Sequence, residues 1–188
     1  MSSLDRKLSS NNLVFLMLIG LISIPSIVLP DIDLSLPLLH HRSMITHSVL
    51  IPFLLMCMKK YKLPDVVILS IFLAFAVHMS ADLTPKAWKG YALIYFPIFN
   101  ISFFGAMGSA LWIFFNIIAC FYFFLKIFRE KYPTIKKNII FILVFLVSLF
   151  YTVEGESIMT IVYSMIGIFV WNSDWVKNLF LSNDKKNE

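Results

Sequence analysis

The chain has 188 residues, of which 59% are hydrophobic and only 14% are charged. A soluble domain carries about a quarter charged residues, so this composition excludes an ordinary soluble protein and favours a membrane protein. The formal charge of +5 could suggest nucleic-acid binding, but the basic residues cluster at the ends of apolar runs, as membrane topology requires, and we expect no nucleic-acid partner.

The apolar residues gather into segments that we expect to be helices, because lipid offers the backbone no other partners. The first follows Arg6 and Lys7 and resembles a secretory signal. Pro25 and Pro30 interrupt it and no good cleavage site precedes Asp31, so we expect a retained helix. A span takes roughly 20 apolar residues, and the shorter segments leave open that some helices are tilted or partly inserted. The six segments are 13–29, 44–58, 65–83, 104–127, 138–153 and 157–172.

These segments predict one all-α integral membrane domain over residues 1–188, a bundle of about five to six transmembrane helices. The chemistry-bearing residues gather in a region at about 28–98. Additional helices follow over 104–172, and residues 173–188 form a tail that we expect to be cytoplasmic.

The basic residues predict the orientation of this bundle. With the N-terminus inside, thirteen Lys and Arg residues fall on the inner side, and only Arg42, Lys86 and Lys89 fall outside. The positive-inside rule then predicts a multi-pass protein of the cell (inner) membrane with both termini cytoplasmic. Loops 30–43 and 84–103 would share the extracytoplasmic face.

All four histidines lie in two stretches that this topology places on that face. His78 and Asp82 are four residues apart, so on a helix they share one face about 6 Å apart along the axis. Asp31 and Asp33 are two residues apart, and a turn is needed for both to face one ion. The remaining histidines occur in His40-His41-Arg42 and Thr46-His47-Ser48.

Imidazole and carboxylate groups are the ligands expected for zinc, and also for manganese or iron. More than three such ligands can hold two metals. We therefore predict one or two divalent ions, with zinc first. His41 is favoured over the adjacent His40, because neighbouring side chains rarely bind the same ion. The predicted metal ligands are Asp31, Asp33, His41, His47, His78 and Asp82.

Structural roles for the same residues stay open. His78 and Asp82 could form only a hydrogen-bonded pair at a helix end, Asp31 could cap a helix, and Asp33 could be a solvated loop residue. Other polar residues fit helix caps, an interfacial belt or a solvated turn better than a site: Thr46, Ser48, Lys86, Trp88, Lys89, Glu154 and Glu156.

Three ordered motifs resemble the YdjM-like family of membrane-bound metal-dependent hydrolases, also described as LexA-binding, inner-membrane-associated hydrolases. They are Pro30-Asp31-Ile32-Asp33, His41-Arg42 with Thr46-His47-Ser48, and His78-x-x-x-Asp82-x-Thr84-Pro85. The resemblance covers roughly residues 28 to 98. It implies a metal-dependent hydrolase, distantly similar to zinc-dependent phospholipase C and P1-type nucleases, with the six residues above at the motif positions. Family members often carry a histidine in the first helix, whereas residues 1–30 here contain none.

We expect a metal-activated water to attack a phosphoester or lipid-linked substrate at the extracytoplasmic membrane surface. The predicted catalytic residues are Asp33, Arg42 and Asp82. One aspartate would serve as general base, and Arg42, with Lys86 or Lys89, would hold an anionic group. Membrane lipid would then surround the site and supply its substrate.

Two other functions stay open. The cluster could bind metal for structure or sensing, in a non-enzymatic membrane scaffold with a protein partner. A small transporter ranks last, because it should carry polar residues deep in several helices and only Asn116 lies well inside a segment beyond the third helix.

Overall fold

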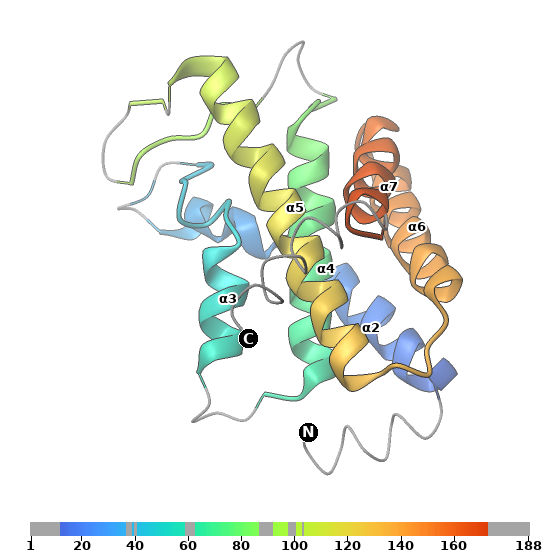
Figure 1. The fold of residues 1–188 in the computed structure, drawn as a ribbon. Coiled ribbons are helices and arrows are strands. Elements are labelled where there is room, and N and C mark those ends of the chain that lie inside the picture. The colour runs from blue at the N-terminus through green and yellow to red at the C-terminus, as the bar shows by residue number, and fades with distance from the viewer. Residues whose placement is uncertain are drawn as a thin grey trace, which may run out of the picture.

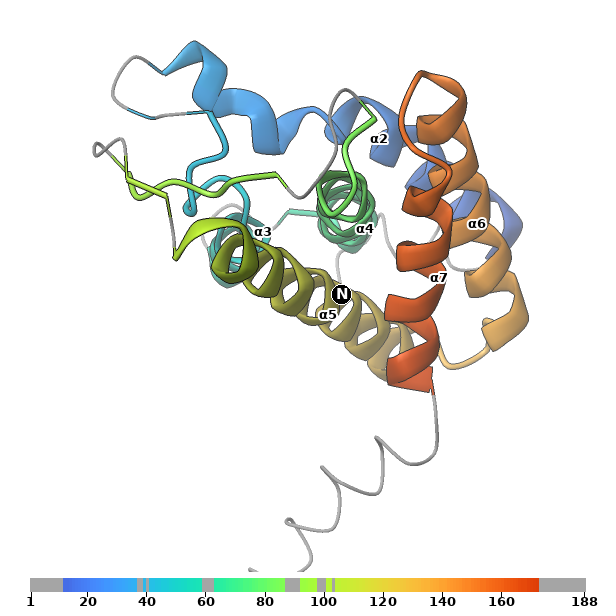
Figure 2. The same ribbon diagram turned by 90° about the horizontal axis from the view of Figure 1, so that it is seen from above.

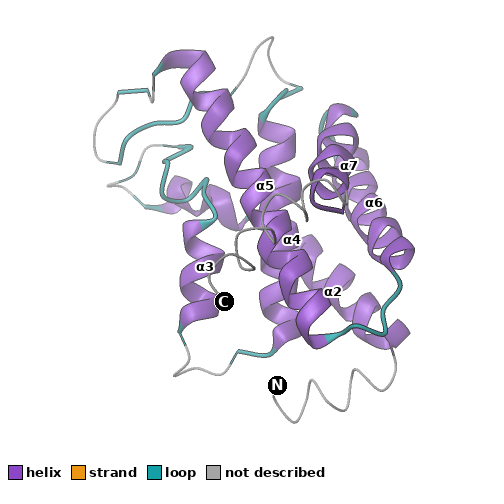
Figure 3. Ribbon diagram, in the orientation of Figure 1, coloured by secondary structure: helices purple, strands orange, loops and turns teal. Residues whose placement is uncertain are grey.

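The computed structural model describes residues 12–36, 39, 41–58, 63–86, 92–97, 101–102 and 104–172, and these residues form helices joined by loops (Figures 1 and 3). Within them, β pairing is limited to isolated bridges of Tyr95 with Ser43 and Ser102. The helical elements are α2 (Asn12–Ser26), the 3-10 helix η1 (Leu29–Ser35), α3 (Leu50–Cys57), α4 (Asp65–Asp82), α5 (Gly105–Lys131), α6 (Lys137–Val153) and α7 (Met159–Asn172).

Helix α4 is the centre of the bundle. Every residue of α4 except Val67 is buried, as expected for a helix that is apolar all round. Seen along its axis, α4 is surrounded by α2, α3, α5, α6 and α7 (Figure 2). His78 and Asp82 belong to this helix, so they lie in the protein interior and not on a lipid-facing surface.

Three segments are long and apolar enough to cross a membrane: Asn12–Ser35, Asp65–Asp82 and Gly105–Lys131. The apolar helices α6 and α7 are shorter. Large apolar side chains also cover the outside of the bundle, among them Met107, Phe115 and Phe169, as lipid contact requires and a soluble surface rarely shows. The predicted all-α membrane bundle is confirmed.

The six predicted segments all contain helix, with one large difference in their limits. The segment predicted at 44–58 is helical only over Leu50–Cys57, because residues 43–49 form turns held by polar contacts. The apolar run ending at residue 29 leaves the α-helix at Ser26 and continues as η1. The predictions for both chain termini, His40, Trp88 and Lys89 lie outside the described residues.

An ion pair between the buried carboxylate of Asp65 and the exposed Lys131 joins α4 to α5 at the end of the bundle opposite His78. Lys131 donates to Asp65 Oδ1 at 2.6 Å, and the Tyr132 hydroxyl donates to Asp65 Oδ2 at 3.1 Å. Asp65 begins α4 and Lys131 ends α5, so the two helices run antiparallel. This contact fixes the α4 register, and thereby the height of His78 and Asp82 within the bundle.

We expect Asp65→Ala to lower the free energy of unfolding by about 1–2 kcal/mol, because it leaves the buried Tyr132 hydroxyl without its acceptor. Thermal unfolding in detergent measures the change. Lys126→Ala is the matched control, since it removes an exposed i,i+4 pair with Glu130 that is worth at most about 0.5 kcal/mol. Equal effects of both substitutions would contradict the structural role of Asp65.

Candidate metal centre

The 3-10 helix η1 supplies the turn that brings Asp31 and Asp33 to the same cluster. Pro30 lies at its start, where a fixed φ suits a helical turn. The Asp33 side chain is fully buried, whereas that of Asp31 is 30% exposed. The expectation that a turn lies between the two carboxylates is confirmed.

The loop after η1 is held by main-chain bonds to a segment far along the sequence. Met44 N donates to Tyr95 O at 2.9 Å, and Tyr95 N donates to Arg42 O at 3.0 Å. Arg42 has a φ of +61°, which a non-glycine residue rarely adopts and which costs about 1 kcal/mol or more. This pairing compensates that cost and places parts of loops 30–43 and 84–103 side by side.

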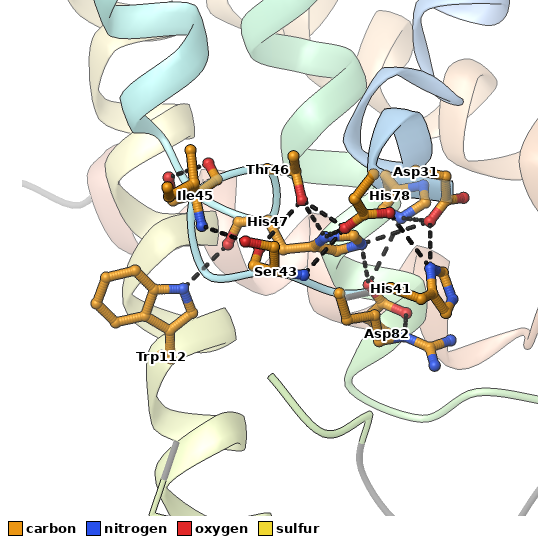
Figure 4. Close-up of polar contacts among 12 residues, drawn as sticks. Asp31, His41, Ser43, Ile45, Thr46, His47, His78, Asp82 and Trp112 are labelled. Carbon is orange, nitrogen blue, oxygen red and sulfur yellow. Dashed lines mark hydrogen bonds and ion pairs between the residues drawn. The ribbon is translucent and has the colours of Figure 1, made fainter. Parts of the chain in front are cut away.

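Helix α5 fixes the same loops through three polar side chains on one face. The Trp112 indole donates to the carbonyl oxygen of His47 at 3.0 Å (Figure 4). Val49 N donates to Asn116 Oδ1 at 2.8 Å, and Ile94 N donates to Ser109 Oγ at 3.0 Å. Asn116, which the sequence could assign to transport, therefore anchors the His47 loop. Its spacing from Trp112 places both on one helix face.

Two histidines and two aspartates from three separate segments converge on one point (Figure 4). His47 Nε2 lies 3.5 Å from Asp31 Oδ1 and 3.4 Å from Asp82 Oδ2. His78 Nε2 lies 3.6 Å from Asp31 Oδ1 and 3.5 Å from Asp82 Oδ2. The ligating atoms of Asp31, His47 and His78 all lie within 4.8 Å of one another.

Three of these converging atoms are buried without a hydrogen-bond partner among the described residues: His47 Nε2, His78 Nε2 and Asp82 Oδ2. Orphaned buried polar atoms are rare, because each costs about 1–3 kcal/mol. Ligands of a four-coordinate zinc ion at about 2.0–2.2 Å lie roughly 3.3–3.6 Å apart, which matches the four spacings above. The donor set, the spacing and the missing partners all fit a metal ion.

Asp33 lies behind His47 and holds its second ring nitrogen. Asp33 Oδ2 accepts from Thr46 Oγ1 at 2.6 Å and from Ser43 N at 3.0 Å, and it lies 3.5 Å from His47 Nδ1. Thr46 Oγ1 is 3.1 Å from the same nitrogen. Thr46, expected to cap α3, thus contacts Asp33 instead, and the cap residue Val49 makes no side-chain cap bond.

Asp82 and His78 likewise contact a further residue through their second polar atom. Arg42 Nε donates to Asp82 Oδ1 at 3.0 Å, which leaves Oδ2 of that carboxylate facing the histidines. The Tyr151 hydroxyl lies 3.2 Å from His78 Nδ1. Nothing in the sequence marks Tyr151 and Trp112 as neighbours of the cluster, because an aromatic residue in an apolar helix has the same pattern as any other apolar residue there.

His41 forms a second candidate group with the two aspartates of η1. Its Nδ1 lies 3.4 Å from Asp33 Oδ1 and 3.7 Å from Asp31 Oδ1, and its side chain is 39% exposed. The ligating atoms of these three residues also lie within 4.8 Å of one another, so Asp31 belongs to both groups. The structure therefore brings together all six predicted ligands. Lys86 and Glu154 lie on the exposed surface.

The carboxylates make the surroundings of His47 strongly negative. Burial lowers the pKa of His47, but contacts to Asp31 and Asp33 and the charge of Asp82 outweigh burial and raise this pKa to about 9. His47 lies in the loop before α3, outside the helices that are long enough to span. Surroundings that favour a proton this strongly also favour a metal cation in its place.

Comparisons with protein-family models, curated proteins and solved structures find no match to this chain. The resemblance to the YdjM-like hydrolases thus depends on the motifs alone and stays a prediction.

We expect Asn116→Leu to speed amide hydrogen exchange in residues 43–49 roughly tenfold, because Val49 N loses its acceptor. Mass spectrometry of exchanged, protease-cleaved protein measures the effect. Asn138→Leu, at an exposed position of α6, is the matched control and should leave this loop unchanged. Unchanged protection of the loop in Asn116→Leu would contradict the anchoring role of α5.

Proposed function

We propose that this protein is a membrane-bound metal-dependent hydrolase. The observation that carries the proposal is the convergence of His47 Nε2, His78 Nε2 and Asp82 Oδ2, buried and without hydrogen-bond partners within the described chain, beside Asp31 Oδ1. A merely structural polar cluster would satisfy these atoms internally. The motif resemblance to the YdjM-like family supports the same conclusion.

Asp31, His47, His78 and Asp82 would hold the first ion, with zinc as the expected metal and manganese or iron as alternatives. The group of Asp31, Asp33 and His41 supports a second ion that shares Asp31. When bound, such a metal polarises a substrate oxygen and lowers the pKa of a coordinated water to about 7.

Solvent access favours Asp31 as the general base. Its side chain is 30% exposed, compared with 0% for Asp33 and 8% for Asp82. Asp33 is occupied by Thr46 and Ser43, so we assign it to holding His47 in place. The catalytic roles predicted for Asp33 and Asp82 are therefore reassigned in this proposal to orientation and to metal binding.

The surroundings of the centre favour an anionic, lipid-linked substrate such as a phosphoester. Arg42 brings a positive charge to the cluster, and a guanidinium group suits a phosphate. The exposed side chains of Ile32, Leu34 and Leu36 lie on or next to η1, where they can contact lipid beside Asp31. A lipid headgroup at the membrane surface would then reach the centre without leaving the bilayer.

The distribution of basic residues supports an extracytoplasmic site. Described basic residues gather at the Asp65 end of the bundle, where α5 ends and α6 begins, whereas Arg42 and Lys86 lie at the other end of α4 or just beyond it. The positive-inside rule assigns the first group to the cytoplasm. The metal centre would then face the outside of the cell membrane.

A non-enzymatic metal scaffold is the second candidate. This candidate is favoured because the cluster joins η1, the His47 loop and the end of α4, and a structural metal ion commonly joins separate segments in this way. The exposure of Asp31 favours the enzyme, since a purely structural site is closed to water.

We expect detergent-purified wild-type protein to hold at least one equivalent of zinc by mass spectrometry, and His78→Ala and Asp31→Asn each to lose it. Glu154→Gln, in the exposed turn between α6 and α7, is the matched control and should retain the metal. Absence of metal in wild type, purified without chelator and supplied with zinc or manganese, would contradict the proposal.

Hydrolysis distinguishes enzyme from scaffold. We expect the zinc-loaded protein to cleave a chromogenic phosphodiester or phospholipids in vesicles, and His78→Ala to lower the rate by more than about a hundredfold. The thermal midpoint of the metal-free variant should stay near that of metal-free wild type. A scaffold would instead bind zinc and show no hydrolysis, with wild type and His78→Ala equally inactive.

A further inference from the structure

Tyr151 of α6 contacts the ring of His78, although the two residues are 73 positions apart in the sequence. The tyrosine hydroxyl lies 3.2 Å from His78 Nδ1. The two rings are nearly parallel, with their centroids 6.0 Å apart and an interplanar angle of 28°. Tyr151 therefore covers the side of His78 that faces away from the other members of the cluster.

The chemistry of imidazole gives this contact a direction. If His78 Nε2 binds a metal, the neutral ring carries its proton on Nδ1 and donates it to the tyrosine oxygen. Histidine ligands almost always have such a partner, which fixes the tautomer and the orientation of the ring. His47 has Asp33 and Thr46 in this position. For His78, the contact that the described residues provide at Nδ1 is Tyr151.

Both helices of the α6–α7 hairpin pack into the bundle. A Cβ atom at Gly167 would lie only 2.7 Å from the ring of Phe121, so α7 packs against α5 at a distance that glycine alone allows. Ile140, Leu143 and Val144 of α6 are buried in the same core. Tyr151 thus lies on a helix that packs into the bundle and not in a loop.

We propose that Tyr151 is a positioning residue of the metal centre, which fixes the His78 ring with Nε2 toward the ion. The inference rests on the proposed metal-binding function and extends it. It makes the α6–α7 hairpin part of the centre, whereas the region that resembles the hydrolase family ends near residue 98. A chain ending before α6 would lack one side of its own metal site.

Tyr151→Phe tests the proposal, because it keeps the ring and removes only the hydroxyl. We expect zinc affinity of the full-length protein, measured by competition with a chromophoric chelator, to fall about tenfold or more. The visible absorption bands of the cobalt-substituted protein should shift as well, while the thermal midpoint of the metal-free protein stays unchanged. Tyr163→Phe makes the same change on α7 as the matched control and should alter neither affinity nor spectrum.

The outcomes separate this inference from the proposed function. Wild-type protein that binds neither zinc nor cobalt would overturn both. Wild type that binds metal, together with a Tyr151→Phe variant of equal affinity and identical cobalt spectrum, would overturn the positioning role alone. A lower midpoint of the metal-free variant with an unchanged cobalt spectrum would also overturn it, because Tyr151 would then only stabilise the fold.

Discussion

Burying imidazole and carboxylate groups in an apolar bundle costs free energy for every polar atom that lacks a partner, and the end of α4 buries two such groups. His78 and Asp82 lie there, on a helix that is almost entirely buried. Each side chain has one polar atom that points into the cluster. Its second polar atom contacts another residue: Tyr151 contacts His78 Nδ1, and Arg42 contacts Asp82 Oδ1. Lipid offers no partners for these polar atoms, so the loops and helices that contact them must come from the protein itself.

The irregular backbone at this end of the bundle follows from the same requirement. Residues 43–49 form turns because their N–H groups and side chains find partners outside a helix: Asp33 accepts from Ser43 and Thr46, and Asn116 accepts from Val49. Non-helical backbone is tolerated near the membrane only where protein buries it or it lines a cavity. The positive φ of Arg42 belongs to the same arrangement, since its carbonyl is paired with Tyr95.

The two ends of α4 differ in how their carboxylates are neutralised. At the first end, Asp65 is paired with Lys131 and Tyr132, so the chain itself supplies the cation and the hydroxyl that this carboxylate needs. At the second end, the described residues place three aspartates together with one arginine. The excess negative charge at that end favours a proton on His47, and by the same physics it would favour a bound cation. The two ends of α4 thus differ in charge balance.

The sequence by itself determined the apolar helices, because the length and composition of each run decide whether it can span a membrane. It also determined that His78 and Asp82 share a face, since helical periodicity fixes neighbours four residues apart. Only the tertiary structure decided which atoms meet: that Asp33 lies behind His47, and that Tyr151 and Trp112 reach the cluster from α6 and α5. Local patterns carry no information on such contacts, because they depend on how helices distant in the chain pack and on which buried polar atoms then need partners.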